Sequence, residues 1–166
     1  MYKILKKEAL NPTVTRMVIE APFVAKRAKA GQFIILRVRE QGERLPLTIA
    51  DSNPEKGTVT IIFQVVGETT MLLNALNEGD CLEDFAGPLG KPSLIDGTKK
   101  VCIIGGGVGC AIAYPTAKAF HEAGADVTTI VGFRNKDLVI LEEEFKKVSD
   151  AYYLMSDDGS VGEKRA

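Results

Sequence analysis

The chain has 166 residues, of which 45% are hydrophobic, so it can form one generous globular domain or two small ones. Its 21 basic and 22 acidic residues leave a net charge of −1, which argues against binding to nucleic acid or to an anionic membrane surface. We expect neither a membrane span nor a signal peptide, because no apolar stretch is long enough and the first residues alternate and carry charge.

The three cysteines, Cys81, Cys102 and Cys110, are widely spaced and odd in number. Such a set is typical of a reducing cytoplasm, where we expect the protein to reside, and it forms neither a disulfide framework nor a metal-binding pattern. The sequence therefore predicts no metal site.

Short β-branched segments broken by turn residues dominate residues 1–97. Strands are predicted at 13–21, 32–39, 47–50 and 58–66, with a turn at 53–57. A helix is predicted at 69–76, where Leu72, Leu73 and Leu76 share one face. Short strands at this spacing favour a closed antiparallel barrel.

Strands and helices alternate from Lys100 onward. Buried strands are predicted at 101–104, 127–131 and 152–155, with helices near 114–123 and 138–148 between them. This order is one mononucleotide-binding half of a doubly wound parallel sheet. With a linker at 92–97, the predicted domains are 1–97, a β-barrel, and 98–166, a partial α/β domain.

A glycine-rich turn follows the strand at 101–104 and consists of Gly105, Gly106, Gly107, Val108 and Gly109. Glycines there let backbone N–H groups approach a diphosphate at a helix N-terminus. The pattern departs from the dehydrogenase fingerprint, because Cys110 stands where the third glycine would be. We therefore predict a nucleotide site of reductase type.

Two charged residues, Asp126 and Arg134, are candidate nucleotide ligands beside this turn. Asp126 has the spacing of the fingerprint's acidic residue but precedes its strand, so we exclude it. Arg134 follows that strand and either faces an adenosine ribose or phosphate or is a solvated loop residue. The choice between NADH and NADPH therefore stays open.

A second candidate site is the segment of Arg44, Leu45, Pro46, Leu47 and Thr48. The arginine can fork onto a diphosphate, and the threonine hydroxyl can bond a cofactor ring nitrogen. Taken alone, the spacing favours a charged loop followed by an edge strand that begins with proline.

A third candidate comprises Ile62, Phe63 and Gln64, which end a strand, and Gly67, Thr69 and Thr70, which open a helix. Free N–H groups and hydroxyls there suit a phosphate, although an ordinary N-cap explains the pattern equally simply.

The remaining polar candidates indicate no catalytic side chain. His121 has polar helix neighbours and is expected to be solvated, and Cys110 is expected to be a small buried packing residue. Glu142, Glu143 and Glu144 are expected to form an exposed helix face.

Taken together and in order, these motifs resemble the flavin subunits related to ferredoxin–NADP reductase. The resemblance spans the chain, and the segments that carry it are 43–51, 63–64, 66–70, 87–92, 132–137 and 157–160. Within that family the chain resembles the small FAD subunit of sulfide dehydrogenase, also called NADH-dependent ferredoxin:NADP oxidoreductase. It also resembles the electron-transfer subunit of dihydroorotate dehydrogenase B.

This resemblance implies a Greek-key FAD-binding barrel followed by an NAD(P)-binding α/β domain. The segment 44–48 would hold the flavin diphosphate and ring, 62–64 would lie along the flavin, and 69–70 would contact its phosphates. The glycine turn would receive the diphosphate of NAD(H) or NADP(H). The implied function is electron transfer between NAD(P)H, flavin and a partner subunit, with no catalytic side chain.

Members of this family extend further and hold a [2Fe–2S] centre on four cysteines, which this chain lacks. We therefore expect a shortened member without an iron–sulfur cluster, whose half sheet leaves an open edge that favours homo-oligomers. Two alternatives remain: a stand-alone NAD(P)H:flavin reductase that uses flavin as a loose substrate, and a non-catalytic nucleotide-binding module.

Overall fold

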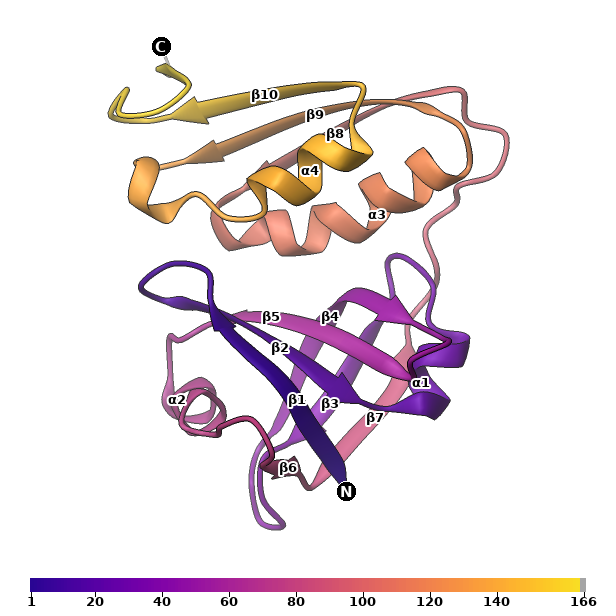
Figure 1. Cartoon of the computed structure of the whole chain (residues 1–166), viewed down its shortest axis with the longest axis vertical. Helices are drawn as coiled ribbons and strands as arrows, with labels where there is room; N and C mark the ends of the chain where they lie inside the picture. The colour runs from indigo at the N-terminus through magenta and orange to yellow at the C-terminus, as the bar shows by residue number, and fades with distance from the viewer. Residues whose placement is uncertain (165–166) are drawn as a thin grey trace. The chain divides into compact units, whose positions relative to one another are not determined.

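A computed structural model describes residues 1–164, and its contacts divide the chain into two compact units (Figure 1). The first unit is Met1–Ser93, and the second begins at Leu94. Within residues 1–164, no helix combines the length and the apolar character needed to cross a membrane.

The first unit is a seven-stranded antiparallel sheet. Its strands are β1 (Tyr2–Ala9), β2 (Val14–Glu20), β3 (Phe33–Arg37), β4 (Arg44–Asn53), β5 (Thr58–Gln64), β6 (Cys81–Leu82) and β7 (Asp84–Leu89). They lie in the order β6-β1-β2-β5-β4-β3-β7, in which β5, β4 and β3 form a meander and β2 lies beside β5. The end strands β6 and β7 are separated in sequence by Glu83 alone, so the sheet curls into a nearly closed Greek-key barrel. The predicted barrel is confirmed.

The core of the barrel follows from strand alternation. Inward positions of successive strands are fully buried, as for Met17 and Ile19 on β2, Ile34 and Leu36 on β3, and Ile61 on β5. Two short helices complete the unit, α1 (Pro22–Arg27), with proline in its first turn, and α2 (Glu68–Asn74). The strands β1, β6 and β7 and the helix α1 were absent from the sequence prediction.

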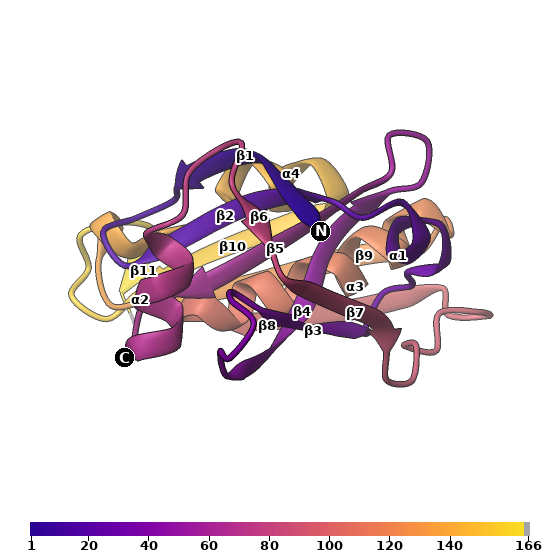
Figure 2. The ribbon, with the colours of Figure 1, turned by 90° about the horizontal axis from the view of Figure 1, so that it is seen from below.

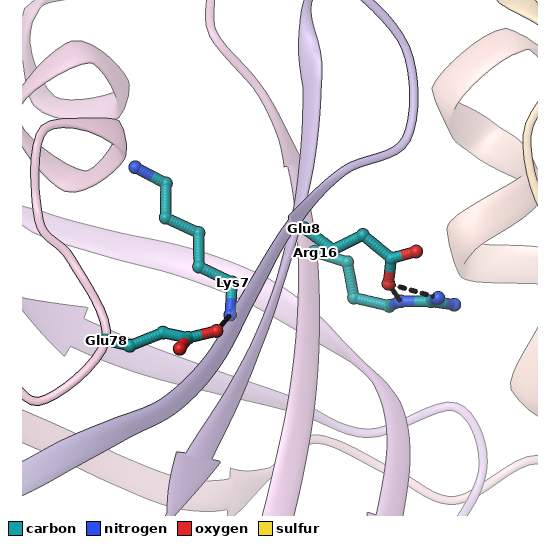
Figure 3. Close-up of polar contacts among 4 residues, drawn as sticks. All are labelled: Lys7, Glu8, Arg16 and Glu78. Atoms are coloured by element: carbon teal, nitrogen blue, oxygen red, sulfur yellow. Dashed lines mark hydrogen bonds and ion pairs between the residues drawn. The ribbon is translucent and has the colours of Figure 1, made fainter.

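Strand β1 fixes the position of α2. The Lys7 ammonium donates hydrogen bonds to the carbonyls of Asn74 (2.5 Å) and Leu76 (2.9 Å), where a cation satisfies the end of the helix. The Lys7 backbone N–H also donates to the Glu78 carboxylate at 3.0 Å (Figure 3). The helix is therefore tied to the barrel at its C-terminal end.

The neighbouring residue, Glu8, projects to the opposite face of β1 (Figure 3). Its carboxylate lies 2.7 Å from the Arg16 guanidinium on β2, and the hydrogen bond from Arg16 lowers the pKa of this carboxyl. This pair links the first two strands on the outer surface of the barrel.

The second unit is a four-stranded parallel sheet in the order β11-β10-β9-β8. Its elements are β8 (Lys100–Gly106), η1 (Gly107–Gly109), α3 (Cys110–Glu122), β9 (Asp126–Phe133), η2 (Lys136–Leu138), α4 (Glu142–Val148), β10 (Ala151–Ser156) and β11 (Glu163–Lys164). The two helices lie on the same side of the sheet (Figure 1). The predicted partial parallel sheet is confirmed, with β8 at one edge.

Both predicted helix starts were wrong by four residues. Helix α3 begins at Cys110 instead of 114, because the chain passes from the glycine turn through a 3-10 turn directly into the helix. Helix α4 begins at Glu142 instead of 138, because the extended conformation of Val139 ends the short 3-10 turn at Leu138 and Leu141 adopts the left-handed conformation directly before α4.

The two faces of the parallel sheet differ in burial. The side chains of Val127, Val131 and Phe133 are buried on the face covered by α3 and α4. On the other face, Ile104 is 72% exposed and Tyr153 is 51% exposed. The described part of this sheet thus presents one apolar surface to solvent.

Candidate functional site

Strand β4 carries the predicted segment 44–48 with alternating orientation. Leu45 and Leu47 pack against the barrel core, so Arg44, Pro46 and Thr48 lie on its outer face. The strand begins at Arg44, three residues before its predicted start, and its proline lies within the strand.

Strands β4 and β5 stop pairing with each other at the predicted segments 44–48 and 62–64. Their antiparallel ladder extends from Asn53↔Thr58 to Ile49↔Ile61 and then ends. Beyond that point β4 pairs with β3, and β5 pairs with β2. We call this region, formed by 44–48 and 62–64, the fork. Its facing strand edges offer backbone donors and acceptors that are not used in pairing β4 with β5.

The fork has apolar and polar outer positions. Phe63 points into the core and is 2% exposed, so only its backbone can serve a ligand. Ile62 and Gln64 alternate with it and lie on the outer face, as does Thr48 on β4. A planar ligand with hydrogen-bonding edges fits this combination of side chains and free backbone groups.

The start of α2 is brought to the same side of the barrel by Glu43. The Thr69 hydroxyl donates to the Glu43 carboxylate, one residue before Arg44. The Thr70 hydroxyl accepts from the N–H groups of Val66 (2.9 Å) and Gly67 (3.0 Å) and donates to the Gly67 carbonyl at 2.9 Å. Thr70 therefore stabilises the helix start, and the predicted segments 44–48, 62–64 and 67–70 form one neighbourhood.

Arg44 is the free charge of this neighbourhood. Its side chain is exposed and makes no hydrogen bond or ion pair with any residue from 1 to 164. A guanidinium with all its donors available fits a diphosphate, which it can bind through two parallel hydrogen bonds.

In the glycine turn of the second unit, the local backbone or packing requires glycine at two positions, and two other glycines leave open space where a side chain would lie. Gly107 has a φ of +53°, and a Cβ on Gly105 would lie 3.0 Å from the Cys110 sulfur. A Cβ on Gly106 or Gly109 would meet nothing within 4 Å. Open space above backbone N–H groups at the start of a 13-residue helix fits a diphosphate.

Cys110 itself belongs to the packing of this turn. It is fully buried, and burial raises the pKa of its thiol to about 12, so the group stays protonated at neutral pH. The prediction of a packing residue is confirmed. His121 is exposed, as predicted.

The two charged residues considered beside the glycine turn, Arg134 and Asp126, lie at opposite edges of the parallel sheet. Gly106 pairs with Gly132 at the carboxyl edge of the sheet, and the exposed Arg134 follows two residues later. Asp126 pairs with Lys100 at the opposite, amino edge. Ligands of open parallel sheets bind at the carboxyl edge. The predicted position of Asp126 at the start of its strand is confirmed, and its exclusion as a nucleotide ligand stays a prediction.

A cavity of about 320 Å³ along β10 is lined by none of the residues predicted to bind a cofactor. Its lining residues include Glu142, Lys146 and Tyr152, and the buried Tyr152 hydroxyl has no hydrogen-bond partner among residues 1–164. Burial raises the pKa of this hydroxyl. The cavity is therefore separate from the predicted nucleotide site.

Comparison with known proteins identifies clear relatives. No protein-family model matches the chain. It is 47% identical over 164 residues to the dihydroorotate dehydrogenase B (NAD(+)) electron transfer subunit homolog of Thermotoga maritima, covering 99% of this chain and 58% of that protein. It is 36% identical over 166 residues to the dihydroorotate dehydrogenase B electron transfer subunit of Streptococcus mutans, covering 97% of this chain and 63% of the relative.

A solved structure agrees with these relatives. A chain of the NADH-dependent reduced ferredoxin-NADP oxidoreductase, studied for flavin-based electron bifurcation, superimposes with a TM-score of 0.92 and 45% identity. The match covers 99% of this chain and 59% of that one. The sequence thus spans about three fifths of the length of the relatives it matches.

Proposed function

Because the chain is similar to electron-transfer subunits of dihydroorotate dehydrogenase B and to a chain of the NADH-dependent reduced ferredoxin-NADP oxidoreductase, we propose that it belongs to the ferredoxin–NADP reductase-like family and is an FAD-binding electron-transfer subunit of an oxidoreductase. It moves electrons between NAD(P)H, flavin and a partner protein. The observation that carries the proposal is the fork, which lies beside an arginine with no protein partner among residues 1–164.

The first unit holds the FAD. Arg44 binds the diphosphate, and the outer face of the fork, with Thr48, Ile62 and Gln64, supports the flavin ring. Thr69, displaced from Glu43, and the backbone at the start of α2 supply further donors to the phosphates. The segment from Arg44 to Thr48 spans about 13 Å of extended chain, which separates the phosphate end from the ring end.

The second unit holds the nicotinamide nucleotide. The open space above Gly106 and Gly109 receives its diphosphate, and Arg134 at the same edge is available to its adenosine ribose or phosphate. NADH and NADPH are both compatible with an exposed arginine at this position.

When bound, FAD supplies the redox chemistry of the reaction, since it accepts hydride and releases single electrons. The protein contributes binding, orientation and electrostatics. No side chain of either unit is assigned the role of acid or base, because the thiol of Cys110 is buried and protonated and His121 is exposed on a helix.

The partner is a catalytic or electron-accepting subunit. Two relatives are named as electron transfer subunits of dihydroorotate dehydrogenase B or a homologue of one, which implies a separate subunit that performs the other half-reaction. The identity of the final acceptor is open, because the chain spans only part of those relatives.

An anaerobic visible spectrum of the purified protein, reconstituted with FAD and then mixed with NADH or NADPH, tests the proposal. Flavin absorbance that survives gel filtration and bleaches on mixing is the expected result. FAD lost on gel filtration would favour a flavin reductase that uses flavin as a substrate. A protein that takes up no FAD would contradict the proposal.

A further inference from the structure

Three charged residues form one cross-strand row beside the proposed diphosphate site. In the register of the barrel, Arg44 on β4 is the partner of Arg37 on β3, and Arg37 is the partner of Asp84 on β7. The three strands run side by side (Figure 2). The row therefore places two arginines next to each other, with one carboxylate at the end.

The two arginines of this row differ in their partners. The Arg37 guanidinium lies 2.5 Å from the Asp84 carboxylate through Nη2 and 2.6 Å through Nε, and its Nη1 donates to the Glu40 carbonyl. The charge of Arg37 is thus neutralised and its side chain fixed, whereas Arg44 has no such partner among residues 1–164. Because of this arrangement, an incoming diphosphate meets one free guanidinium and not two competing ones.

A cavity of about 260 Å³ adjoins the row. Its lining combines the three charged residues with apolar groups: Tyr2, Ile35, Leu36, Arg37, Arg44, Asp84, Phe85 and Ala86. Ile35 and Ala86 are cross-strand partners, and the rings of Tyr2 and Phe85 lie 5.7 Å apart. The cavity thus offers apolar surface of the kind that receives a flat base.

The same cavity contains a hydrogen-bond acceptor. Both bonds from Arg37 end on Oδ2 of Asp84, and Oδ1 has no partner among residues 1–164. Asp84 is 43% exposed, so this oxygen is open to a ligand. A carboxylate oxygen is a suitable acceptor for ribose hydroxyls.

We propose that the Arg37–Asp84 pair and the cavity beside it select a flavin dinucleotide over a flavin mononucleotide by binding the adenosine half of FAD. The inference rests on the proposed function, because Arg44 must first hold the diphosphate. The ribose hydroxyls bond Asp84, and the adenine lies against Ile35, Ala86 and Tyr2. FMN ends at its phosphate beside Arg44 and gains nothing from the cavity.

The test is a pair of titrations of the apoprotein, one with FAD and one with FMN, followed by flavin fluorescence. Two variants change the cavity: Asp84→Ala removes the acceptor, and Ala86→Trp fills the space from an exposed position. Glu83→Gln is the matched control, since it removes a neighbouring carboxylate that does not line the cavity.

The wild-type protein is expected to bind FAD at least tenfold more tightly than FMN. Each cavity variant should lower the ratio of FAD affinity to FMN affinity about tenfold. Ala86→Trp, which keeps the Arg37–Asp84 pair, should also leave FMN binding within about twofold, while Glu83→Gln should change neither affinity. Asp84→Glu should restore part of the preference, because it keeps the carboxylate, and a purely structural role would not separate the two flavins.

Three results would overturn the inference. The wild-type protein binds FAD and FMN equally, the variants weaken both flavins to the same extent, or the variants leave FAD binding unchanged. A wild-type protein that binds neither flavin would instead refute the proposed function itself, so the two failures are distinguishable.

Discussion

The barrel and the parallel sheet solve the problem of burying their side chains in different ways. The barrel closes around its own core, in which Met17, Ile19 and Ile61 are fully buried. The parallel sheet buries one face under α3 and α4, while Ile104 on its other face is 72% exposed. A sheet that curls on itself needs no covering layer, whereas an open parallel sheet needs one on each face.

This difference affects the two proposed sites. The fork lies on a unit that closes around its own core, and α2 is held by Lys7 at one end and by Thr70 at the other. The glycine turn lies on a sheet that, within residues 1–164, exposes Ile104 and Tyr153 on one face and has β8 at one edge. We therefore expect FAD binding to be the more robust property of this chain and NAD(P)H binding to be the more fragile one.

The largest expected effect is that of Arg44→Ala on the barrel site. Loss of a guanidinium that binds a diphosphate should weaken FAD binding about 100-fold, or about 2.7 kcal/mol. The melting temperature of the apoprotein should not change, because Arg44 contacts no other residue through hydrogen bonds or ion pairs within residues 1–164. Titration with FAD and thermal melts measure the two quantities.

Arg39→Ala is the control for this variant, since Arg39 is an exposed arginine just beyond β3. Equal losses of FAD affinity in both variants would mean that general positive charge attracts the flavin. The contrast between the two arginines would then disappear.

In the second unit, Gly107→Ala and Gly106→Ala should have different effects. Gly107 has a φ of +53°, so alanine there should cost about 1–2 kcal/mol of stability. Gly106 has an ordinary extended conformation and free space around its Cβ position, so Gly106→Ala should leave the melting temperature unchanged. Its methyl group should nevertheless weaken NADH binding about tenfold by occupying the space for the diphosphate.

The rate of anaerobic reduction of the bound flavin, measured as a function of NADH concentration, reports NADH binding in both glycine variants. FAD binding serves as the internal control. Unchanged reduction kinetics in Gly106→Ala would place the nucleotide elsewhere than the glycine turn. Weakened FAD binding in either variant would contradict the assignment of FAD to the barrel.

The bare face of the parallel sheet should promote self-association at micromolar concentration. Exposed apolar residues beside an unpaired edge strand favour contacts between copies of the chain. Ile104→Lys places a charge on that face and edge and should shift the protein to a monomer in sedimentation velocity experiments. A wild-type chain that is monomeric at every concentration would rule out this prediction.

The smallest expected effect concerns the Glu8–Arg16 pair on the barrel. The pKa of the Glu8 carboxyl is lowered in the folded protein, so the pair stabilises the fold at neutral pH. This contribution is about 0.5 kcal/mol for so exposed a pair, and it is lost as the pH falls through the lowered pKa. Glu8→Gln should therefore be less stable than wild type at pH 7 and equally stable near pH 2; an equal difference at both pH values would contradict this account.

Much of the fold was predictable because its strands have regular composition. The segments that form β2, β5, β8 and β9 are rich in β-branched residues, and the segment that forms β10 carries Tyr152 and Tyr153, so all five stand out locally. The strand β7 was missed because Gly87 and Pro88 interrupt it, and α1 because it is only six residues long. Pairing with β3 holds β7 in an extended conformation that its own sequence does not indicate.

The sites differ in how much of them is encoded locally. The glycine turn is contiguous, so its position and the exclusion of Asp126 follow from the sequence. The fork was predictable only through family resemblance, because Pro46 made a strand start at Arg44 look improbable. Proline is tolerated there because this half of β4 has β3 on one side and is unpaired on the other. The Arg37–Asp84 pair joins residues 47 positions apart and has no local signal.

Hydrogen–deuterium exchange of the full chain, with and without FAD, tests the central claim most directly. The account predicts that FAD protects the amides of 43–48, 62–64 and 67–70 and leaves those of 105–109 unchanged. Protection confined to the glycine turn, or no protection anywhere in the barrel, would contradict the assignment of the flavin site to the fork.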